Sequence, residues 1–408
     1  MKCRFCGNAL TNKFVDLVNS PPSNSFLTED QLNEPEVFYP LAVYVCEKCW
    51  LVQIAEYKKA GDIFNQEYIY FSSYSKSWLD HSKKYVDMVT KRFGLNSCSQ
   101  VIEIASNDGY LLQYFKHKDI PCLGIEPTKN TAKVAIDKGI ETICEFFGET
   151  LAGKLVEDDR KADLLIGNNV LAHVPDVKDF VGGLKIALKQ GGVITMEFPH
   201  LMKLVQFNQF DTIYHEHFSY LSLHAVEAIF ASAGLEVFDV EELPTHGGSL
   251  RIYAKHAQDM KNPVCPSVCE LKQKERRIGM LTVEYYKNFQ SNVDRVKDSV
   301  LSFLLEESKQ GRKLIAYGAA AKGNTLLNYC GIKKDMIPFV VDASTWKQGK
   351  FLPGTHIPVV NEQEISKLKP DYVLILPWNL KSEISEQLKY IRDWQGKFVV
   401  AIPEIEIF

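Results

Sequence analysis

The densest group of proton-transferring side chains in this chain lies between residues 214 and 220. In the run YHEHFSY, Tyr214 precedes His215, Glu216 and His217. Imidazole and carboxylate groups exchange protons close to neutral pH, so the run indicates acid/base chemistry rather than simple binding. A metal site and a polar loop are the alternatives, although H-E-H lacks the i, i+4 histidine spacing of a zinc-binding helix.

Four cysteines near the N-terminus form two C-x-x-C pairs, Cys3 with Cys6 and Cys46 with Cys49. Each short turn offers two sulfurs to one tetrahedral ion, which predicts a structural Zn²⁺ held by four thiolates. Two disulfides or unrelated thiols are the alternatives, and reducing conditions disfavour disulfides in a chain without a leader. With four sulfur ligands the ion should stabilise a small domain and take no part in a reaction.

A second candidate site follows the apolar run at 101–104. A polar loop, SNDG at 106–109, comes next, and Glu126 ends the following apolar run. A carboxylate at that place accepts hydrogen bonds from ribose hydroxyls. The loop lacks the G-x-G-x-x-G of a dinucleotide site, and S-adenosylmethionine carries an ammonium group and no phosphate, so it is favoured over NAD. A structural turn is the alternative. The expected cofactor contacts are Glu103, Ala105, Asn107, Asp108, Gly109, Glu126, Pro127, Phe147, Asn168 and Asn169.

The elements that must position these groups follow from the apolar pattern. A chain of 408 residues suggests two or three domains. Between about 99 and 255, short apolar runs alternate with helical segments, which predicts α/β structure with a doubly wound parallel sheet. A helix is expected over 62–88, a charged helical connector over 262–309, and a second α/β unit beyond it. The expected strands are 100–105, 121–125, 162–167, 192–198, 235–240 and 249–254, then 313–317, 337–341, 372–376 and 397–401.

Composition excludes several classes of function. The net charge of −4 gives no reason to expect nucleic acid as a partner. No apolar run approaches 18 residues and no charged-then-apolar leader is present, so we expect neither a membrane span nor a secretory signal. The default expectation is a cytoplasmic protein.

Together, these fragments resemble the sugar C-methyltransferases, which add branching methyl groups to nucleotide-linked 4-keto-deoxysugars such as the precursors of mycarose and tetronitrose. The resemblance implies a zinc-binding domain over 1–66, a methyltransferase domain with a class I sheet over 67–280, and a Rossmann-like domain over 281–408 that helps hold the sugar nucleotide. It extends over nearly the whole chain: the cysteine pairs, YFSS at 70–73, EIASNDG at 103–109, NNVLAH at 168–173, YHEH at 214–217, THGGSLR at 245–251, GAAAKGNT at 318–325, VD at 341–342 and KQGKFLPG at 347–354.

The resemblance also implies roles for single residues. It implies catalytic roles for Tyr214, Glu216, His217, His173 and Tyr70, with His217 as the base. Tyr68 and Tyr74 are close alternatives for the N-terminal tyrosine. The implied substrate contacts are Tyr68, Ser72, Ser73, His246, Gly248, Arg251, Lys322, Asn324, Asp342 and Lys347.

The chemistry of such a reaction explains the residue types. A ketone at C4 of the sugar acidifies the C3 hydrogen, so a base of near-neutral pKa is required. We expect His217 to remove the proton while Glu216 orients its imidazole or electrostatically supports the imidazolium. Tyr214, His173 or Tyr70 would donate a hydrogen bond to the enolate oxygen. The turn GAAAKG at 318–323, with Lys322 and Lys347, is suited to the diphosphate of a dTDP or GDP sugar, although a structural turn is the alternative.

Two rival functions remain open at this point. The 318–323 turn could serve an NAD-dependent sugar-nucleotide oxidoreductase, or the zinc domain could be a protein-binding module.

Overall fold

The middle of the chain folds around a seven-stranded sheet in the order β10-β11-β8-β7-β4-β5-β6. The five strands from β8 to β6 are parallel, whereas β11 runs antiparallel to both β8 and β10. The computed structural model describes residues 1–59, 61 and 71–408. The strands are β4 (Val101–Ile104), β5 (Cys122–Ile125), β6 (Thr142–Ile143), β7 (Ala162–Asn168), β8 (Leu188–Pro199), β10 (Leu235–Leu243) and β11 (Ser249–His256).

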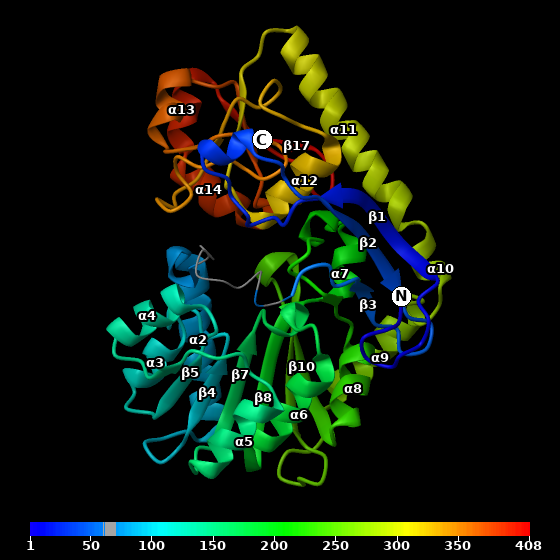
Figure 1. The fold of residues 1–408 in the computed structure, drawn as a ribbon, viewed down its shortest axis with the longest axis vertical. Coiled ribbons are helices and arrows are strands. Elements are labelled where there is room, and N and C mark those ends of the chain that lie inside the picture. The colour runs from blue at the N-terminus through cyan, green and yellow to red at the C-terminus, as the bar shows by residue number, and fades with distance from the viewer. Residues whose placement is uncertain (60, 62–70) are drawn as a thin grey trace.

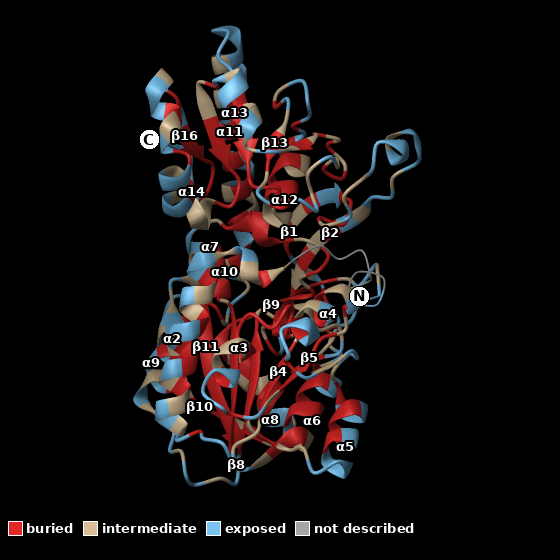
Figure 2. Cartoon of the chain, turned by 90° about the vertical axis from the view of Figure 1, so that its left-hand side faces the viewer, coloured by how far each residue is buried: buried red, intermediate tan, exposed pale blue. Residues whose placement is uncertain are grey.

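The predicted doubly wound sheet is therefore confirmed. Its central strands are continuous apolar runs because helices cover both faces, and Figure 2 shows these strands as buried between helices with exposed outer faces. The strand order reverses between β4 and β7, so the loops that follow these strands open a crevice at one edge of the sheet. The covering helices are α3 (Leu112–Lys116), α4 (Lys129–Asp137), α5 (Glu149–Glu157), α6 (Val177–Ala187) and α8 (Leu223–Ser232).

The helix expected over 62–88 is α2, which spans Lys76–Phe93. It begins at Lys76 because the Ser75 side chain accepts a hydrogen bond from the N–H of Trp78, and it ends at Gly94 in the left-handed conformation. The expected stretch 62–70 lies outside the described residues, and Ser72–Tyr74 form a separate 3₁₀ turn.

The N-terminal lobe is an antiparallel sheet in the order β1-β2-β3-β9, which the sequence analysis did not predict. Its strands are β1 (Asn12–Ser20), β2 (Tyr39–Val45), β3 (Val52–Ile54) and β9 (Ser219–Tyr220). The last of these ends the run YHEHFSY, so the candidate catalytic turn is joined directly to the N-terminal lobe.

The C-terminal lobe is built on a six-stranded sheet in the order β14-β13-β12-β15-β16-β17. It confirms the second α/β unit, with β17 as an antiparallel edge strand. Its strands are β12 (Leu314–Tyr317), β13 (Val340–Val341), β14 (Val359–Val360), β15 (Tyr372–Ile375), β16 (Lys397–Val400) and β17 (Glu406–Ile407), and its helices are α12 (Ala321–Cys330), α13 (Gln363–Leu368) and α14 (Lys381–Gln387).

The expected connector over 262–309 is helical but broken into α9 (Pro266–Arg277), α10 (Glu284–Lys287) and α11 (Phe289–Lys309). In Figure 1, α11 runs along one side of the molecule from the C-terminal lobe towards β1. Phe289 at its start stacks on Phe14 of β1, with ring centroids 4.4 Å apart. The domain boundaries at 66 and 280 remain predictions. The strand β9, which follows residue 66, pairs with β3, which precedes it, and α11, which follows residue 280, packs on β1. Among the described helices, none combines the length and apolar character needed to cross a membrane.

Candidate active site

A cavity of about 380 Å³ lies where the crevice of the middle sheet faces the C-terminal lobe. Residues from all three lobes line it, so it collects loops that are far apart in the sequence. The candidate functional residues on its wall are Asn24, Ser72, Ala105, Asn107, Glu126, Pro127, Phe147, Asn168, Asn169, His173, Tyr214, Glu216, His217, His246, Lys322 and Lys347.

The loop after β4, where the sequence predicts cofactor contacts, forms one side of the cavity. Ala105 and Asn107 have positive φ angles of 54° and 50°, which turns the chain sharply under the cavity. Glu126 holds this turn, because its carboxylate accepts hydrogen bonds from the N–H groups of Asn107 at 2.9 Å and Thr128 at 2.8 Å. Burial raises the pKa of Glu126, while these hydrogen bonds oppose the rise.

The loop after β7 adds the side-chain amides of Asn168 and Asn169 to the cavity wall. Both amide atoms of Asn168 and the Oδ1 atom of Asn169 lack a hydrogen bond of normal geometry among the described residues. Buried polar groups of this kind indicate a ligand. Phe147 packs edge-on against Phe180 beside them, with centroids 5.6 Å apart, and forms an apolar wall suited to an adenine ring. These residues fit S-adenosylmethionine, which offers ribose hydroxyls, an amino acid group and an adenine.

Three of the predicted cofactor residues lie behind the loop and not on the cavity wall. Glu103 is fully buried within β4, and burial raises its pKa well above the usual value. The Asp108 carboxylate lies 3.5 Å from the ammonium of Lys138. At Gly109 (φ 74°) a Cβ atom would come within 2.4 Å of the Ile140 side chain, so this glycine permits close packing.

The candidate base, His217, is held in one tautomer. Its Nδ1 atom lies 2.8 Å from the carbonyl oxygen of Thr212, which can only accept, so Nδ1 carries the hydrogen and Nε2 is an acceptor. The Tyr214 hydroxyl, 3.0 Å from Nε2, therefore donates to it. Burial, and then the neighbouring His173, lower the pKa of His217 well below its usual value. The ring is therefore neutral, and its pKa lies below the near-neutral value expected of the base.

His173 is held in the same way. Its Nδ1 atom lies 2.8 Å from the main-chain oxygen of Glu216, and its ring centroid is 4.6 Å from that of His217. Burial lowers the pKa of His173 to about 4, so it is neutral, with Nε2 as an acceptor.

The Glu216 carboxylate differs from the expectation that it orients His217. Among the described residues no hydrogen bond joins the two side chains, and the Thr212 carbonyl orients the imidazole instead. The reason is the tight turn closed by the His217 N–H on the Tyr214 carbonyl, which sends successive side chains in different directions. Glu216 accepts instead from Asn24 of the N-terminal lobe, at 2.6 Å, and burial raises its pKa to about 7.

The opposite wall of the cavity belongs to the C-terminal lobe. The Lys322 ammonium donates to Asn379 at 2.7 Å, and Lys347 donates to the Ala319 carbonyl at 2.8 Å. Lys347 is also 3.5 Å from Asp342. Two ammonium groups thus face a cavity whose other wall carries the cofactor loop.

Several predicted substrate residues do not line the cavity. Arg251 forms a buried ion pair with Glu197, at 2.7 Å, and a second pair with the partly exposed Glu241, at 3.0 Å. Asn324 donates to the Ser23 carbonyl, at 2.7 Å.

The remaining predictions divide between packing positions and residues that are not described. Gly248 lies against Lys203, and Ser73 accepts from Lys138 outside the cavity. The N–H of Ser72, which does line the cavity, donates to Asn107 at 2.9 Å. Tyr68 and Tyr70 lie outside the described residues.

The structure adds cavity residues that the sequence analysis missed, among them Asn24, Trp78, Thr212 and Asn379. No local signal marks Asn24, because its contact with Glu216 joins residues 192 positions apart.

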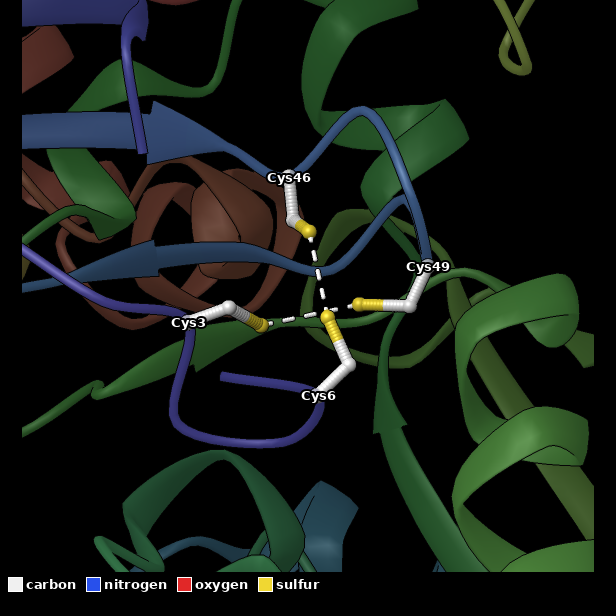
Figure 3. Close-up of side chains that lie close together, drawn as sticks. All are labelled: Cys3, Cys6, Cys46 and Cys49. Atoms are coloured by element: carbon white, nitrogen blue, oxygen red, sulfur yellow. Dashed lines mark hydrogen bonds between the residues drawn. The ribbon is translucent and has the colours of Figure 1, made fainter. Parts of the chain in front are cut away.

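The four N-terminal cysteines form one cluster, shown in Figure 3. All four Sγ atoms lie within 4.8 Å of one another, and the Cys3–Cys49 and Cys6–Cys46 separations are both 3.5 Å. Tetrahedral zinc with Zn–S bonds of about 2.3 Å spaces its sulfurs about 3.8 Å apart, so the cluster fits the ion. Four thiolates would leave no open position, which makes the zinc structural.

Comparisons with known proteins agree with this arrangement. Family models match three consecutive parts of the chain: a zinc binding domain over residues 3–64, a methyltransferase domain over 78–240, and a C-methyltransferase C-terminal domain over 244–403. The C-methyltransferase NovU of Streptomyces niveus is 34% identical over 403 residues, which cover 99% of this chain and 96% of NovU.

Two solved structures similar to this chain each cover less than half of it. A S-adenosylmethionine-dependent methyltransferase from Clostridium acetobutylicum covers 43% of this chain and 91% of its own, at 12% identity and a TM-score of 0.35. The magnesium protoporphyrin IX methyltransferase ChlM from Synechocystis covers 44% and 80%, at 14% identity and a TM-score of 0.32. The class I methyltransferase fold is instead shown by the strand order and the family model. By its similarity to NovU along almost its whole length, the chain belongs to the family of S-adenosylmethionine-dependent C-methyltransferases with an N-terminal zinc-binding domain.

Proposed function

We propose that this C-methyltransferase methylates C3 of a nucleotide-linked 4-keto-6-deoxysugar. The observation that carries the proposal is the neutral imidazole of His217, held by the Thr212 carbonyl in the cavity that also contains the cofactor loop and two lysines. Methylation at carbon requires a carbon nucleophile, and a ketone next to the C–H bond provides one after deprotonation. A site for this reaction on a nucleotide sugar therefore needs a base next to a cavity wall that can bind anionic groups.

His217 is the base of the proposed reaction. Its Nε2 atom takes the C3 proton, and the bonding electrons move onto the C4 carbonyl oxygen to form an enolate. Nε2 has a single acceptor lone pair, so the Tyr214 hydroxyl must release it before the proton is taken, and Tyr214 then turns its hydrogen towards the C4 oxygen that becomes the enolate oxygen. A donor of this kind is worth about 3 kcal/mol to the transition state.

The structure favours Tyr214 over His173 as the enolate donor. His173 gives its one ring hydrogen to the main-chain oxygen of Glu216, and its low pKa keeps Nε2 unprotonated. It therefore has no hydrogen to offer the enolate, and its place beside His217 suits packing and orientation of the base.

S-adenosylmethionine supplies the electrophilic methyl group. Ala105, Asn107 and Glu126 would hold it from the loops after β4 and β5, and Asn168 and Asn169 from the loop after β7.

The sugar nucleotide would lie against the C-terminal lobe. Lys322 and Lys347 place two positive charges on the wall opposite the cofactor loop, and α12 begins there with its amide groups towards the cavity. A diphosphate is the group best matched to paired ammonium groups beside a helix N-terminus.

The alternative of an NAD-dependent oxidoreductase has less support. Its ribose would need the Asp342 carboxylate, which, unlike Glu126, is absent from the described cavity wall.

The test is solvent deuterium exchange at C3 of the ketosugar. Incubation with S-adenosylmethionine and a panel of dTDP- and GDP-linked 4-keto-6-deoxysugars, read by mass, first identifies the substrate as the one that gains one methyl group. In His217→Asn, exchange at C3 and turnover should fall by about 10²- to 10⁴-fold, with unchanged affinity for S-adenosylmethionine.

The matched control is His215→Asn. His215 faces Tyr39 and the Pro40 carbonyl, away from the base, so this variant should exchange deuterium at nearly the normal rate. Undiminished exchange in His217→Asn would show that another group is the base.

A further inference from the structure

The loop between β1 and β2 brings the N-terminal lobe into contact with both other lobes. The Ser23 carbonyl accepts from Asn324 of α12, at 2.7 Å. Leu27 pairs with Phe351 through two main-chain hydrogen bonds of 3.0 and 2.9 Å. The segment between these anchors, which includes Asn24, is therefore fixed against the C-terminal lobe while it faces the cavity.

From this position Asn24 reaches the catalytic turn of the middle lobe. Its Nδ2 atom lies 2.6 Å from Oε2 of Glu216, and both residues line the cavity. Glu216 is only 2% exposed, so its carboxylate depends on protein partners for stabilisation. An amide N–H donates and cannot accept, so this contact favours the ionised carboxylate over the protonated form.

The other charged and titratable groups around Glu216 do little to stabilise its ionised carboxylate directly. His173 contacts only its main-chain oxygen, and His217 hydrogen-bonds to Thr212 and Tyr214. Lys58 of the N-terminal lobe acts at longer range, and Lys322 donates to Asn379. Burial raises the pKa of Glu216 to about 7, and the side chain and main chain of Asn24 oppose that rise more than Lys58 does.

We propose that Asn24 is a positioning residue of the methyl-transfer site, which holds the Glu216 carboxylate ionised in the cavity that His217 also lines. The negative charge then stabilises the imidazolium that forms when His217 takes the substrate proton. The zinc-binding lobe thus takes part in the reaction through this loop, and its role extends beyond stability. The inference rests on the proposed function, because it gives Glu216 a charge that acts on His217 as the proposed base.

The sign of the pH dependence follows from two ionisations. His217 must be neutral, and its low pKa satisfies this at any pH near neutrality. Glu216 must be ionised, so activity should rise with pH through about 7. Removal of the Asn24 donor raises the pKa of Glu216 further, which moves the acid limb of the kcat profile to higher pH.

The experiment is the pH profile of kcat for wild type, Asn24→Ala and Asn24→Asp. In Asn24→Ala we expect the acid limb to shift up by about one pH unit, with kcat about fivefold lower at pH 7 and close to wild type at pH 9. Asn24→Asp keeps the shape of the side chain but puts an acceptor against Glu216, so its shift should be larger. The KM for S-adenosylmethionine should stay within twofold of wild type in both.

Ser23→Ala is the matched control from the same loop. The Ser23 hydroxyl has no hydrogen bond among the described residues, and its main-chain carbonyl, which Asn324 uses, remains. Its profile should match wild type. If Asn24→Ala does not fold, the isosteric Asn24→Asp decides the question.

Two outcomes separate the inference from the function beneath it. Turnover by wild type with an unshifted acid limb in both Asn24 variants overturns the role of Asn24 alone. Failure of wild type to methylate any nucleotide 4-ketosugar in the panel overturns the proposed function instead.

Discussion

The middle and C-terminal lobes use the same backbone device for different chemistry. In each, an acidic residue ends the second strand and clamps the loop after the first strand. Glu126 accepts from the N–H groups of Asn107 and Thr128, and Asp342 accepts from those of Ala319 and Ser344. All four distances lie between 2.7 and 2.9 Å.

The two carboxylates differ in whether they line the cavity. Glu126 itself lines the cavity and is available to ribose hydroxyls. Asp342 does not line it, and the nearby Lys347 does, so the C-terminal lobe offers positive charge where the middle lobe offers a carboxylate. The comparison teaches that the sheet edge only places the loops, while a few side chains decide which charge each loop presents to the cavity.

The largest effect is expected from Glu126→Gln, which disrupts the hydrogen bonds that hold the loop after β4. Glu126→Gln puts an amide NH₂ against one of the two N–H donors and removes the negative charge. We expect the affinity for S-adenosylmethionine to fall about 50-fold, since hydrogen bonds to charged groups contribute about 1.5–3 kcal/mol. Calorimetric titration would measure this, and sugar-nucleotide affinity should change less than twofold. Equal losses for both ligands would contradict the assignment of the two walls.

The glycines in the two loops should behave alike, because both serve packing. Gly109 and Gly318 have φ angles of 74° and 89°, and a Cβ atom at either would meet a neighbour, Ile140 or Pro377, at 2.4 Å. We expect Gly109→Ala and Gly318→Ala each to lower the free energy of unfolding by about 2 kcal/mol, measured by denaturant titration. A loss at only one position would mean that the two loops are not equivalent scaffolds.

The cavity wall that carries Lys322 and Lys347 is tested by Lys322→Ala. Removal of one of two ammonium groups should weaken binding of the nucleotide sugar about tenfold and leave S-adenosylmethionine binding unchanged, because the contact is charge-assisted. The exposed Lys334 of the same lobe provides the control, and Lys334→Ala should bind both ligands normally. Tenfold weaker binding in both variants would point to general charge attraction and not to a site.

The smallest effect is expected from Asp342→Asn, the counterpart of the Glu126 substitution. It loosens the same kind of clamp, but at a residue that does not face the cavity, so nucleotide-sugar affinity should fall only about threefold through displacement of Lys347. The same titrations measure it. A loss as large as that in Glu126→Gln would show that Asp342 contacts a ligand directly.

Much of the scaffold could be predicted because its signals are local. The strands β4, β5, β7 and β12 are short apolar runs buried on both faces, and such runs are visible in a sequence. In the N-terminal sheet, β9 was missed because it is only two residues long and pairs with a strand more than 160 positions earlier. Long-range pairing of this kind leaves no periodic pattern.

The candidate site was predicted less evenly, for the same reason. Ala105, Asn107 and Glu126 follow strand ends, and topology brings them to one edge. Arg251 and Asn324 share the residue types of ligand-binding groups, but ion pairs and a carbonyl contact use them inside the protein. A polar side chain in a sequence does not reveal whether its partner is a ligand or another residue.

The sequence by itself determined the sulfur ligands of the zinc site, the central parallel strands and the cluster of titratable residues near 217. Those features depend on residue type and on spacing within a few positions. Only the tertiary structure decided that Thr212 orients His217, that Asn24 holds Glu216, and that two lysines face the cofactor loop. Each of these is a contact between distant segments, and its geometry exists only after three lobes have packed around one cavity.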